Sequence, residues 1–232
     1  MRNFSIFLFL SGLATSVSAV QLADSIADFS MVQGQNGWRY GYYDVTQDGI
    51  NGTLPYHLSD FQLMTQNDGT TWWVNNINST TNGYFTRLYA NGGHGNGNDA
   101  YPGRLRALRE HFAIRRWTST YTGPVEIELK IRKIDTAGGN GVGFHVYRNG
   151  TSIFGPNMAF TSGVVTTFLI SSSVAAGDHL DFALDPWQAQ DANDNSQLSM
   201  KIYAVPEPSS VISLSLAAGL FSRKLRTKQK PS

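Results

Sequence analysis

The chain has 232 residues, 41% of them hydrophobic and 12% aromatic, so one sizeable core in a single domain is expected. Cysteine is absent, which excludes disulfides, thiolate zinc sites and a cysteine nucleophile. The formal net charge is +1, but residues 20–204 hold 12 Lys and Arg against 16 Asp and Glu, and this acidic centre argues against nucleic-acid binding.

Residues 1–19 have the pattern of a secretory signal peptide. Arg2 gives a positive start, an apolar run extends from Phe4 to Leu13, and Val17-Ser18-Ala19 supplies a small-x-small cleavage site. Ten apolar residues are too few to cross a bilayer as a permanent anchor. We therefore expect a signal helix that is removed during export.

The first half of residues 20–204 is rich in aromatic side chains. Trp38, Tyr40 and Tyr42 alternate with other residues, which predicts a strand with three rings on one face. Trp72 and Trp73 are adjacent, so in a strand at most one of them enters the core. Residues 91–98 are predicted to be a Gly/Asn/His loop, and residues 103–112 a short helix.

Strand signals dominate the second half. Residues 125–132 alternate apolar and charged side chains without a break, and residues 142–146 repeat the alternation. Asn149-Gly150 predicts a two-residue hairpin turn, with residues 151–154 as the returning strand. Further strands are expected at residues 164–170, 180–184 and 198–203. Short strands separated by Gly, Asp and Asn turns predict an all-β, antiparallel β-sandwich.

Exposed aromatic rings in such a sandwich are candidates for stacking on sugars. The candidate ligand-binding residues are Trp38, Tyr40, Tyr42, Trp72, Trp73 and Trp187. A neighbouring Asp, Asn or Arg would fix the sugar hydroxyls. Core packing is the alternative role for each ring, because large aromatic side chains dominate protein cores.

Residues 191–196 form an oxygen-rich segment between two predicted strands. Asp191, Asn193 and Asn195 are candidate ligands for a structural calcium ion, which prefers six to eight oxygen atoms. The alternative is a plain Asx-rich turn without metal. No cofactor is required by either interpretation.

The sequence gives little support for catalysis. Asp181 and Asp185 lie four apart on one strand face, about 13 Å from each other by strand rise, which is too far for the carboxylate pair of a glycosidase. The five histidines show no metal-binding spacing. Arg115 and Arg116 are interpreted as a solvated strand-edge pair, with acidic sugars as the alternative partner. A non-enzymatic protein is therefore expected.

The C-terminal segment, residues 205–232, combines three parts in order. Val205-Pro206-Glu207-Pro208-Ser209-Ser210 is followed by an apolar stretch to Phe221, expected to be helical, and then by basic residues up to Lys230. This order resembles the PEP-CTERM sorting signal, also known as the C-terminal segment of ice-binding proteins. The resemblance implies transient membrane contact, cleavage near Pro206, Glu207 and Pro208 by an exosortase-type transpeptidase, and delivery to the cell surface, outer envelope or extracellular matrix.

Three further segments carry a second resemblance: residues 33–44, 114–119 and 177–182. They are similar to landmarks of a jelly-roll module related to carbohydrate-binding sandwiches, and the resemblance covers most of residues 28–204. It implies a non-catalytic surface or matrix protein that binds polysaccharide through its jelly-roll β-sandwich. The alternatives are a structural matrix or adhesion component without a small-ligand site, and a glycan-cleaving enzyme.

Overall fold

The computed structural model describes residues 19–46, 55–74, 84–97, 109–135, 141–155, 163–187 and 194–206. Nearly all of them belong to one compact unit, Val20–Val205. Within these ranges the chain is all-β: it contains strands and two three-residue 3₁₀ turns, and no α-helix. The expected signal helix and C-terminal apolar helix lie outside the described residues. In the described ranges, no helix has the length and apolar character needed to cross a membrane.

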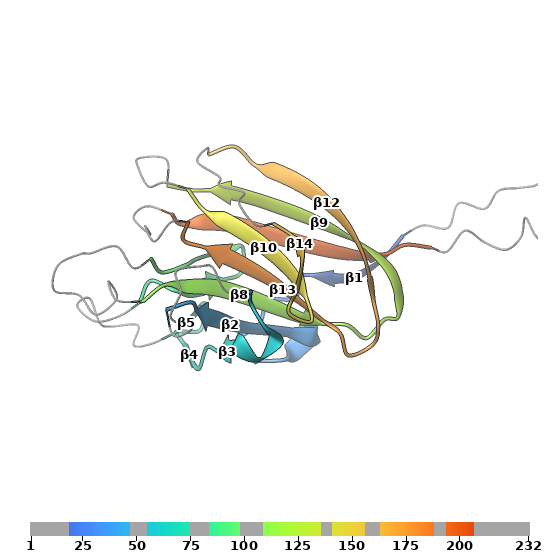
Figure 1. The fold of residues 1–232 in the computed structure, drawn as a ribbon, viewed down its shortest axis with the longest axis horizontal. Helices are drawn as coiled ribbons and strands as arrows, with labels where there is room; N and C mark the ends of the chain where they lie inside the picture. Colours follow the sequence, from blue (N-terminus) through green and yellow to red (C-terminus); the bar gives the residue numbers. More distant parts are fainter. Residues whose placement is uncertain are drawn as a thin grey trace, which may run out of the picture. The chain divides into compact units, whose positions relative to one another are not determined.

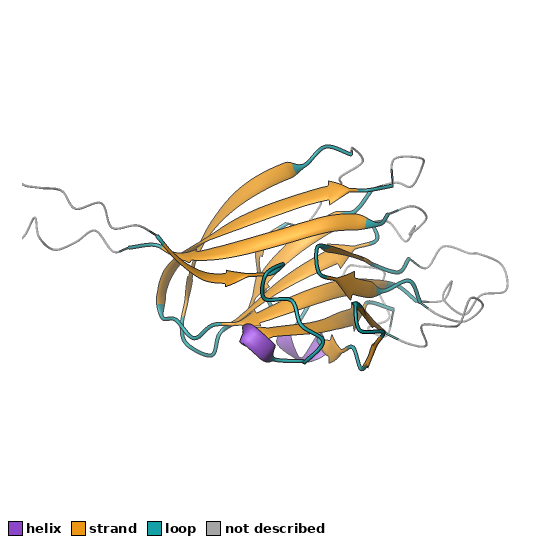
Figure 2. Cartoon of the chain, turned by 180° about the vertical axis from the view of Figure 1, so that it is seen from behind, coloured by secondary structure: helices purple, strands orange, loops and turns teal. Residues whose placement is uncertain are grey.

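The first antiparallel sheet has eight strands, in the order β12-β9-β14-β7-β6-β5-β4, with β1 pairing with β14 (Figures 1 and 2). These strands are β1 (Val20–Asp24), β4 (Gln66–Asn67), β5 (Thr71–Trp73), β6 (Arg87–Tyr89), β7 (Gly92–His94), β9 (Gly123–Lys133), β12 (Thr166–Val174) and β14 (Ser196–Ala204).

The second antiparallel sheet has six strands, in the order β11-β10-β13-β8-β2-β3. These strands are β2 (Trp38–Asp44), β3 (Gln62–Leu63), β8 (His111–Thr118), β10 (Gly143–Arg148), β11 (Thr151–Phe154) and β13 (His179–Asp185). The 3₁₀ turns are η1 (Gln35–Gly37) before β2 and η2 (Leu58–Asp60) before β3.

The main core lies between the two sheets. Every second residue of β9 is buried, from Val125 to Ile131, and it meets buried side chains of the six-stranded sheet in one cluster. Tyr40 of β2 stacks on Trp72 of β5 with ring centroids 5.8 Å apart, which joins the sheets directly. Burying one large apolar side chain contributes about 1.5–3 kcal/mol, so this cluster dominates the stability of the sandwich.

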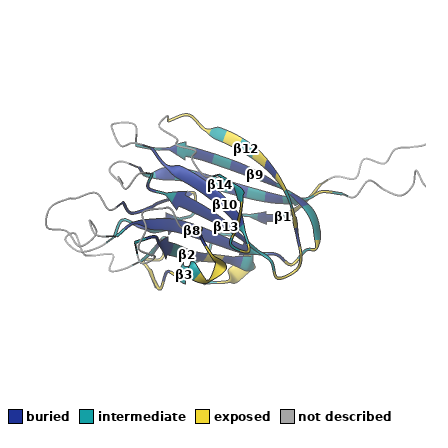
Figure 3. Cartoon of the chain, in the orientation of Figure 1, coloured by how far each residue is buried: buried dark blue, intermediate teal, exposed yellow. Residues whose placement is uncertain are grey.

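The alternation pattern of the second half is confirmed by the strands that form. β9, β13 and β14 cover the predicted segments, β10 begins one residue later than expected, and β12 begins two residues later. The hairpin from β10 to β11 turns at Asn149 and Gly150, which have φ angles of 50° and 82°, as this turn type requires. Figure 3 shows β10, β13 and β8 buried along their length, whereas the edge strand β12 is partly exposed.

Two predictions for the first half are wrong. Residues 91–98 contain strand β7, because Gly92 and Gly93 allow the backbones of β6 and β14 to approach closely on both sides. His111 and Phe112 begin strand β8 rather than end a helix. Residues 103–108 of the expected helix lie outside the described residues.

The expectation that Arg115 and Arg116 form a solvated pair at a strand edge is also wrong. β8 is an interior strand of the six-stranded sheet, and both side chains are buried. Arg115 crosses the core and donates hydrogen bonds to the carbonyl oxygens of Ser25, Tyr89, Ala90 and Gly92. Burial lowers its pKa to about 10, and the four carbonyls bind the two terminal nitrogens of the guanidinium, whereas its Nε has no hydrogen-bond partner among the described residues.

Candidate functional site

The outer face of the eight-stranded sheet carries polar and charged side chains. On β9 these are Glu126, Glu128, Lys130 and Arg132, which alternate with the buried core residues. Across β14 they pair with Tyr203, Lys201, Ser199 and Gln197, in that order. Two ion pairs cross or follow this face, Lys130 to Glu128 at 2.8 Å and Lys201 to Asp24 at 3.6 Å. The face is therefore a broad hydrogen-bonding surface that no described strand covers.

Trp73 is the aromatic platform on this face. Its neighbour Trp72 points into the core and donates its indole N–H to the carbonyl oxygen of Ser30 at 2.9 Å. Trp73 faces outward and is only half-buried. It pairs with Arg87 of β6, whose guanidinium carbon lies 5.4 Å from the Trp73 ring centroid. The prediction that only one of the two tryptophans enters the core is confirmed.

The turn before β5 fixes the Trp73 ring. The Trp73 indole N–H donates to Asp68 Oδ2 at 3.2 Å, and Asp68 Oδ1 accepts from the backbone N–H groups of Thr70 and Thr71 and from the Thr70 hydroxyl at 2.7–2.8 Å. The hydrogen bonds from the Thr70 hydroxyl and its N–H lower the pKa of Asp68 to about 2. Asp68 is therefore an ionised acceptor at every pH above about 3, and it holds the ring before any ligand arrives.

A second aromatic ring links this platform to β14. The Tyr89 hydroxyl donates to Asn195 Oδ1 at 2.7 Å and lies 3.1 Å from the Ser196 carbonyl oxygen. The ring passes over Gly92, where a Cβ atom would lie 2.8 Å from the ring and 2.1 Å from the Ser196 carbonyl oxygen. Only glycine fits this position. The platform formed by Trp73, Arg87 and Tyr89 is therefore contiguous with the polar surface of β14 and β9.

No family model matches this chain, and no curated protein matches it.

Three of the aromatic candidates are in the core, so their predicted role in stacking on sugars is wrong. Trp38, Tyr40 and Trp72 are 0%, 1% and 4% exposed, and no ring face is left for a ligand. Trp38 and Tyr40 do share one face of their strand with Tyr42, as predicted, but that face is the core face. Tyr42 is half-buried, and its hydroxyl donates to Gln62 Oε1 at 2.8 Å.

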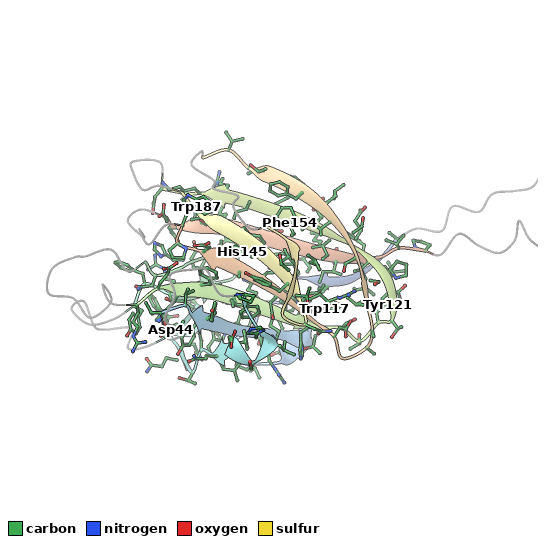
Figure 4. The ribbon with its side chains drawn as sticks, viewed as in Figure 1. Asp44, Trp117, Tyr121, His145, Phe154 and Trp187 are labelled. Carbon is green, nitrogen blue, oxygen red and sulfur yellow. The ribbon has the colours of Figure 1, made fainter. Side chains whose placement is uncertain are left out.

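Trp187 lies at the opposite end of the sheets from Trp117 and Tyr121, and toward the same end as Asp44 (Figure 4). Its backbone has a φ of 52°, and its N–H donates to Asp185 Oδ1 at 2.7 Å. Trp187 is half-buried and is not joined to the Trp73 platform by any described contact.

The predicted calcium ligands are only partly described. Asp191 and Asn193 lie outside the described residues. Asn195 Oδ1 accepts the Tyr89 hydrogen bond. No cluster of three or more His, Cys, Asp or Glu side chains suited to a metal ion occurs in the described ranges. The calcium site stays a prediction. Of the predicted sorting residues, Pro206 is the last described residue, and Glu207 and Pro208 lie beyond it.

The outer face of the six-stranded sheet was not predicted to be a special surface. A second apolar cluster forms on it, in which Tyr43, Tyr56, Phe112 and Tyr147 pack together and Phe61 packs against them. The segment from Tyr56 to Phe61 includes η2, and it therefore packs on this face as a cover. The sequence pattern of β2 and β8 failed to indicate this cluster because both faces of these strands are buried.

A buried ion pair stands at the centre of that second cluster. Arg116 donates to both carboxylate oxygens of Asp181, at 2.6 and 2.8 Å, and to the Tyr56 hydroxyl at 3.0 Å. The Tyr56 hydroxyl in turn donates to Asp181 at 2.9 Å. Burial, and then the charge of Asp181, raise the pKa of Tyr56 far above its ordinary value. Every polar group in the triad is paired, which is the arrangement that a buried charge pair needs.

A second polar group lies further along the same face. His145 Nε2 is 3.0 Å from Asp185 Oδ2, and the imidazole lies between the rings of Phe112 and Tyr147, nearly parallel to both. Glu110 is 5% exposed, and burial, followed by the charge of Asp185, raises its pKa to about 7. The group contains an acid and a histidine, but its near-complete burial fits packing better than contact with a polymer.

One arrangement has the appearance of a catalytic triad. The Thr86 hydroxyl lies 2.9 Å from His111 Nδ1, and His111 Nε2 lies 3.5 Å from Asp44 Oδ2. Thr86 is 0% exposed, so its hydroxyl cannot reach a substrate as a nucleophile would have to. Although burial alone would raise the pKa of Asp44, hydrogen bonds from His111 and Thr46 lower it. These contacts join β2 and β8 to the segment before β6.

Proposed function

We propose that this chain is an exported protein that binds polysaccharide without catalysis, through the outer face of its eight-stranded sheet. The observation that carries the proposal is the half-exposed Trp73 ring, held by Asp68 and flanked by Arg87. A sugar ring packs its C–H face on such an aromatic plane, while charged and amide groups at the rim bind its hydroxyls. At this site the Trp73 ring offers the aromatic plane, and Asp68 and Arg87 are the charged groups at its rim.

The fixed geometry of the platform supports this proposal. A ring that is already held by its own turn loses little conformational freedom when a ligand binds, which favours affinity. The adjacent surface of β14 and β9 extends the site along the sheet, as a polymer requires. The same face carries a line of hydrogen-bonding side chains that the core does not use.

The proposal includes the fold family and the route of export. We take the sandwich to be a jelly roll, residues 1–19 to be a signal peptide, and residues 205–232 to be a PEP-CTERM tail recognised by an exosortase-type transpeptidase. The support for this route is the order of Pro-Glu-Pro, apolar stretch and basic end in the sequence. The protein would then act at the cell surface or in the extracellular matrix.

Replacing Trp73 tests the binding surface. We expect W73A to bind its polysaccharide about tenfold more weakly than the wild-type chain, because one aromatic stacking contact is lost. W73F keeps the ring plane but loses the hydrogen bond to Asp68, so its loss should be smaller. The measurement is a glycan array followed by titration calorimetry with the full chain.

The matched control is Y203A. Tyr203 is a half-buried aromatic residue on the same outer face, at the far end of β14 from Gln197. Its removal should lower the affinity far less than the removal of Trp73, because Tyr203 lies at the end of β14 that does not pair with β7. Equal binding by wild type and W73A, or no binding to any neutral or acidic polysaccharide by protein with an intact β-sheet spectrum, would refute the proposed function.

A further inference from the structure

A pocket of about 240 Å³ lies on the same sheet as the Trp73 platform. Its floor is formed by β9 and β14, and its sides come from the segments that follow β1, precede β7 and precede β12. The polar side chains that line it are Asn91, Lys130, Arg132, Gln197 and Ser199. Arg132 pairs with Gln197 across the two strands, and Lys130 pairs with Ser199. The pocket therefore crosses the middle of the sheet.

Arg132 is the distinctive group in this pocket. Its Nε atom is shielded from solvent and has no hydrogen-bond partner among the described residues. A buried donor without a partner costs free energy, and the cost is larger when the group is charged. Arg115 Nε is unpaired as well, but the terminal nitrogens of Arg115 bind four carbonyls and Arg116 binds Asp181, whereas no nitrogen of the Arg132 guanidinium has a partner among the described residues. Because Arg132 also lines the pocket, its unpaired guanidinium can reach an acceptor that enters the pocket.

The charge of the pocket favours an anion. Lys130 and Arg132 line it, and none of the described lining residues is an aspartate or glutamate. Lys130 is partly neutralised by Glu128, 2.8 Å away. Arg132 has no such ion pair among the described residues. The guanidinium has a planar fork of donors that matches the two oxygens of a carboxylate.

The size and the walls of the pocket restrict the ligand further. Ile26 and Val165 line it and are 41% and 51% exposed, so they offer apolar surface to a ligand. The volume is slightly below the range of about 300–1,000 Å³ that suits drug-sized ligands. One sugar ring, with apolar C–H faces and a single acidic substituent, matches this size and this combination of surfaces.

We propose that the pocket binds one carboxylate-bearing sugar residue of an acidic polysaccharide, with Arg132 holding the carboxylate and Gln197 and Asn91 binding the ring hydroxyls. This inference rests on the proposed polysaccharide-binding function and names its substrate class. Trp73 supplies the stacking contact along the same face, and the pocket supplies selectivity for uronic acids over neutral sugars.

The experiment compares two polymers that differ only at the carboxyl group: polygalacturonate and its fully methyl-esterified form, which carries no charge. Binding of the full wild-type chain is measured by titration calorimetry at two salt concentrations. We expect polygalacturonate to bind at least tenfold more tightly than the ester, since a hydrogen-bonded charged pair is lost on esterification. The preference should decrease at high salt and persist in part, because a shielded pair is screened less than an exposed one.

Two substitutions locate the preference. R132Q should remove most of the preference for polygalacturonate, because it should weaken binding of polygalacturonate far more than binding of the ester. K201Q removes the same charge from the same face, where Lys201 pairs with Asp24 rather than lining the pocket, and should keep the preference. R132K keeps the charge without the planar fork and should retain only part of the preference. This variant therefore distinguishes a carboxylate site from non-specific electrostatic attraction.

The outcomes separate this inference from the function on which it rests. Equal affinity of the wild type for both polymers, or an undiminished preference in folded R132Q, would overturn the carboxylate site while leaving neutral-polysaccharide binding at Trp73 in place. Tight binding of dextran sulfate by R132Q would show that charge alone drives the attraction, and would also overturn the inference. No binding to any polymer would overturn both proposals.

Discussion

Arg115 and Lys133 are cations inside a sandwich that has no disulfides. Arg115 is bound to carbonyl oxygens of the opposite sheet, and Lys133 donates to the Asp135 carbonyl oxygen and lies 3.8 Å from Asp194 Oδ1. Each side chain connects its strand to a loop or to the opposite sheet, and fixes a relative position that apolar packing alone would not fix. Residues 111–118 show no alternation of apolar and polar side chains, so nothing in the pattern distinguishes a buried Arg115 from a solvated one.

Glu110 makes the stability of the protein depend on pH. Its pKa in the folded chain is raised from 4.5 to about 7, so the folded state keeps a proton that the unfolded state loses as the pH rises above 4.5. The free energy of unfolding therefore falls as the pH rises from about 4.5 to 7. Above pH 7 the contribution of Glu110 no longer changes. The full effect is on the order of 3 kcal/mol.

The variant E110Q removes this titration. We expect E110Q to have a higher free energy of unfolding than the wild type at pH 8 and a smaller difference at pH 5, as measured by urea unfolding at both values. Taking the difference between the two proteins at each pH cancels the titration of all other groups. A difference that does not change with pH would show that Glu110 ionises normally in the folded protein.

At the level of elements, the hairpin from β10 to β11 depends on Gly150. Its φ of +82° is unfavourable for any side chain, and an added Cβ would lie 2.7 Å from the backbone nitrogen of Leu58, in the segment that covers the six-stranded sheet. G150A should therefore reduce the free energy of unfolding by more than the roughly 1 kcal/mol of backbone strain alone.

Gly177 is the matched control for this prediction. It has a φ of +93°, but a Cβ there would meet no atom within 4 Å. G177A should show the backbone strain without the clash, so its loss of stability in thermal or urea unfolding should be the smaller of the two. Equal losses for the two variants would mean that the contact between the hairpin and Leu58 contributes nothing.

Among the strands that the sequence predicted well, β9 and β14 are long and exposed on one face, whereas β10 and β13 are buried on both faces. The residues of β9 alternate because the outer face of this strand is exposed to water. The dipeptide Asn149-Gly150 predicts the hairpin turn. β4 to β7 are two or three residues long, too short for a periodic signal, and β7 is built on glycines that pack backbone against backbone. β8 has no alternation because a second cluster covers its outer face, so both faces of the strand are buried.

The candidate site was predictable only in part. Adjacent tryptophans indicated that one ring would leave the core, and the structure selects Trp73. The roles of Asp68 and Arg87 follow from a turn and a strand pairing that bring residues far apart in sequence to one ring. Arg132 was assigned correctly to the outer face, but its missing hydrogen-bond partner depends on the atoms around it and has no signature in the sequence.

For the molecule as a whole, the first and last strands of the sandwich begin and end side by side. Val20 of β1 pairs with Ala204 of β14, and the Val205 N–H donates to the Pro124 carbonyl oxygen at 3.0 Å. Both proposed cleavage points, after Ala19 and near Pro206, thus flank the outermost pairs of the sheet without interrupting them. Removing both terminal segments should leave every described strand pairing intact.

Processing should therefore change the charge of the protein but not its stability. Loss of residues 1–19 and of the segment after the Pro-Glu-Pro motif removes six basic residues, and the net charge falls from +1 for the whole chain to about −4 for residues 20–204. The isoelectric point should shift from about 8.0 to an acidic value. Intact mass and isoelectric focusing of the secreted protein measure both changes, and P206A/P208A should block the C-terminal one. A secreted species that retains Arg223 to Lys230, with an unshifted isoelectric point, would contradict the sorting route. A cleaved species with an unaltered unfolding midpoint would agree with it, because the strand pairs at both ends of the sandwich do not involve the removed segments.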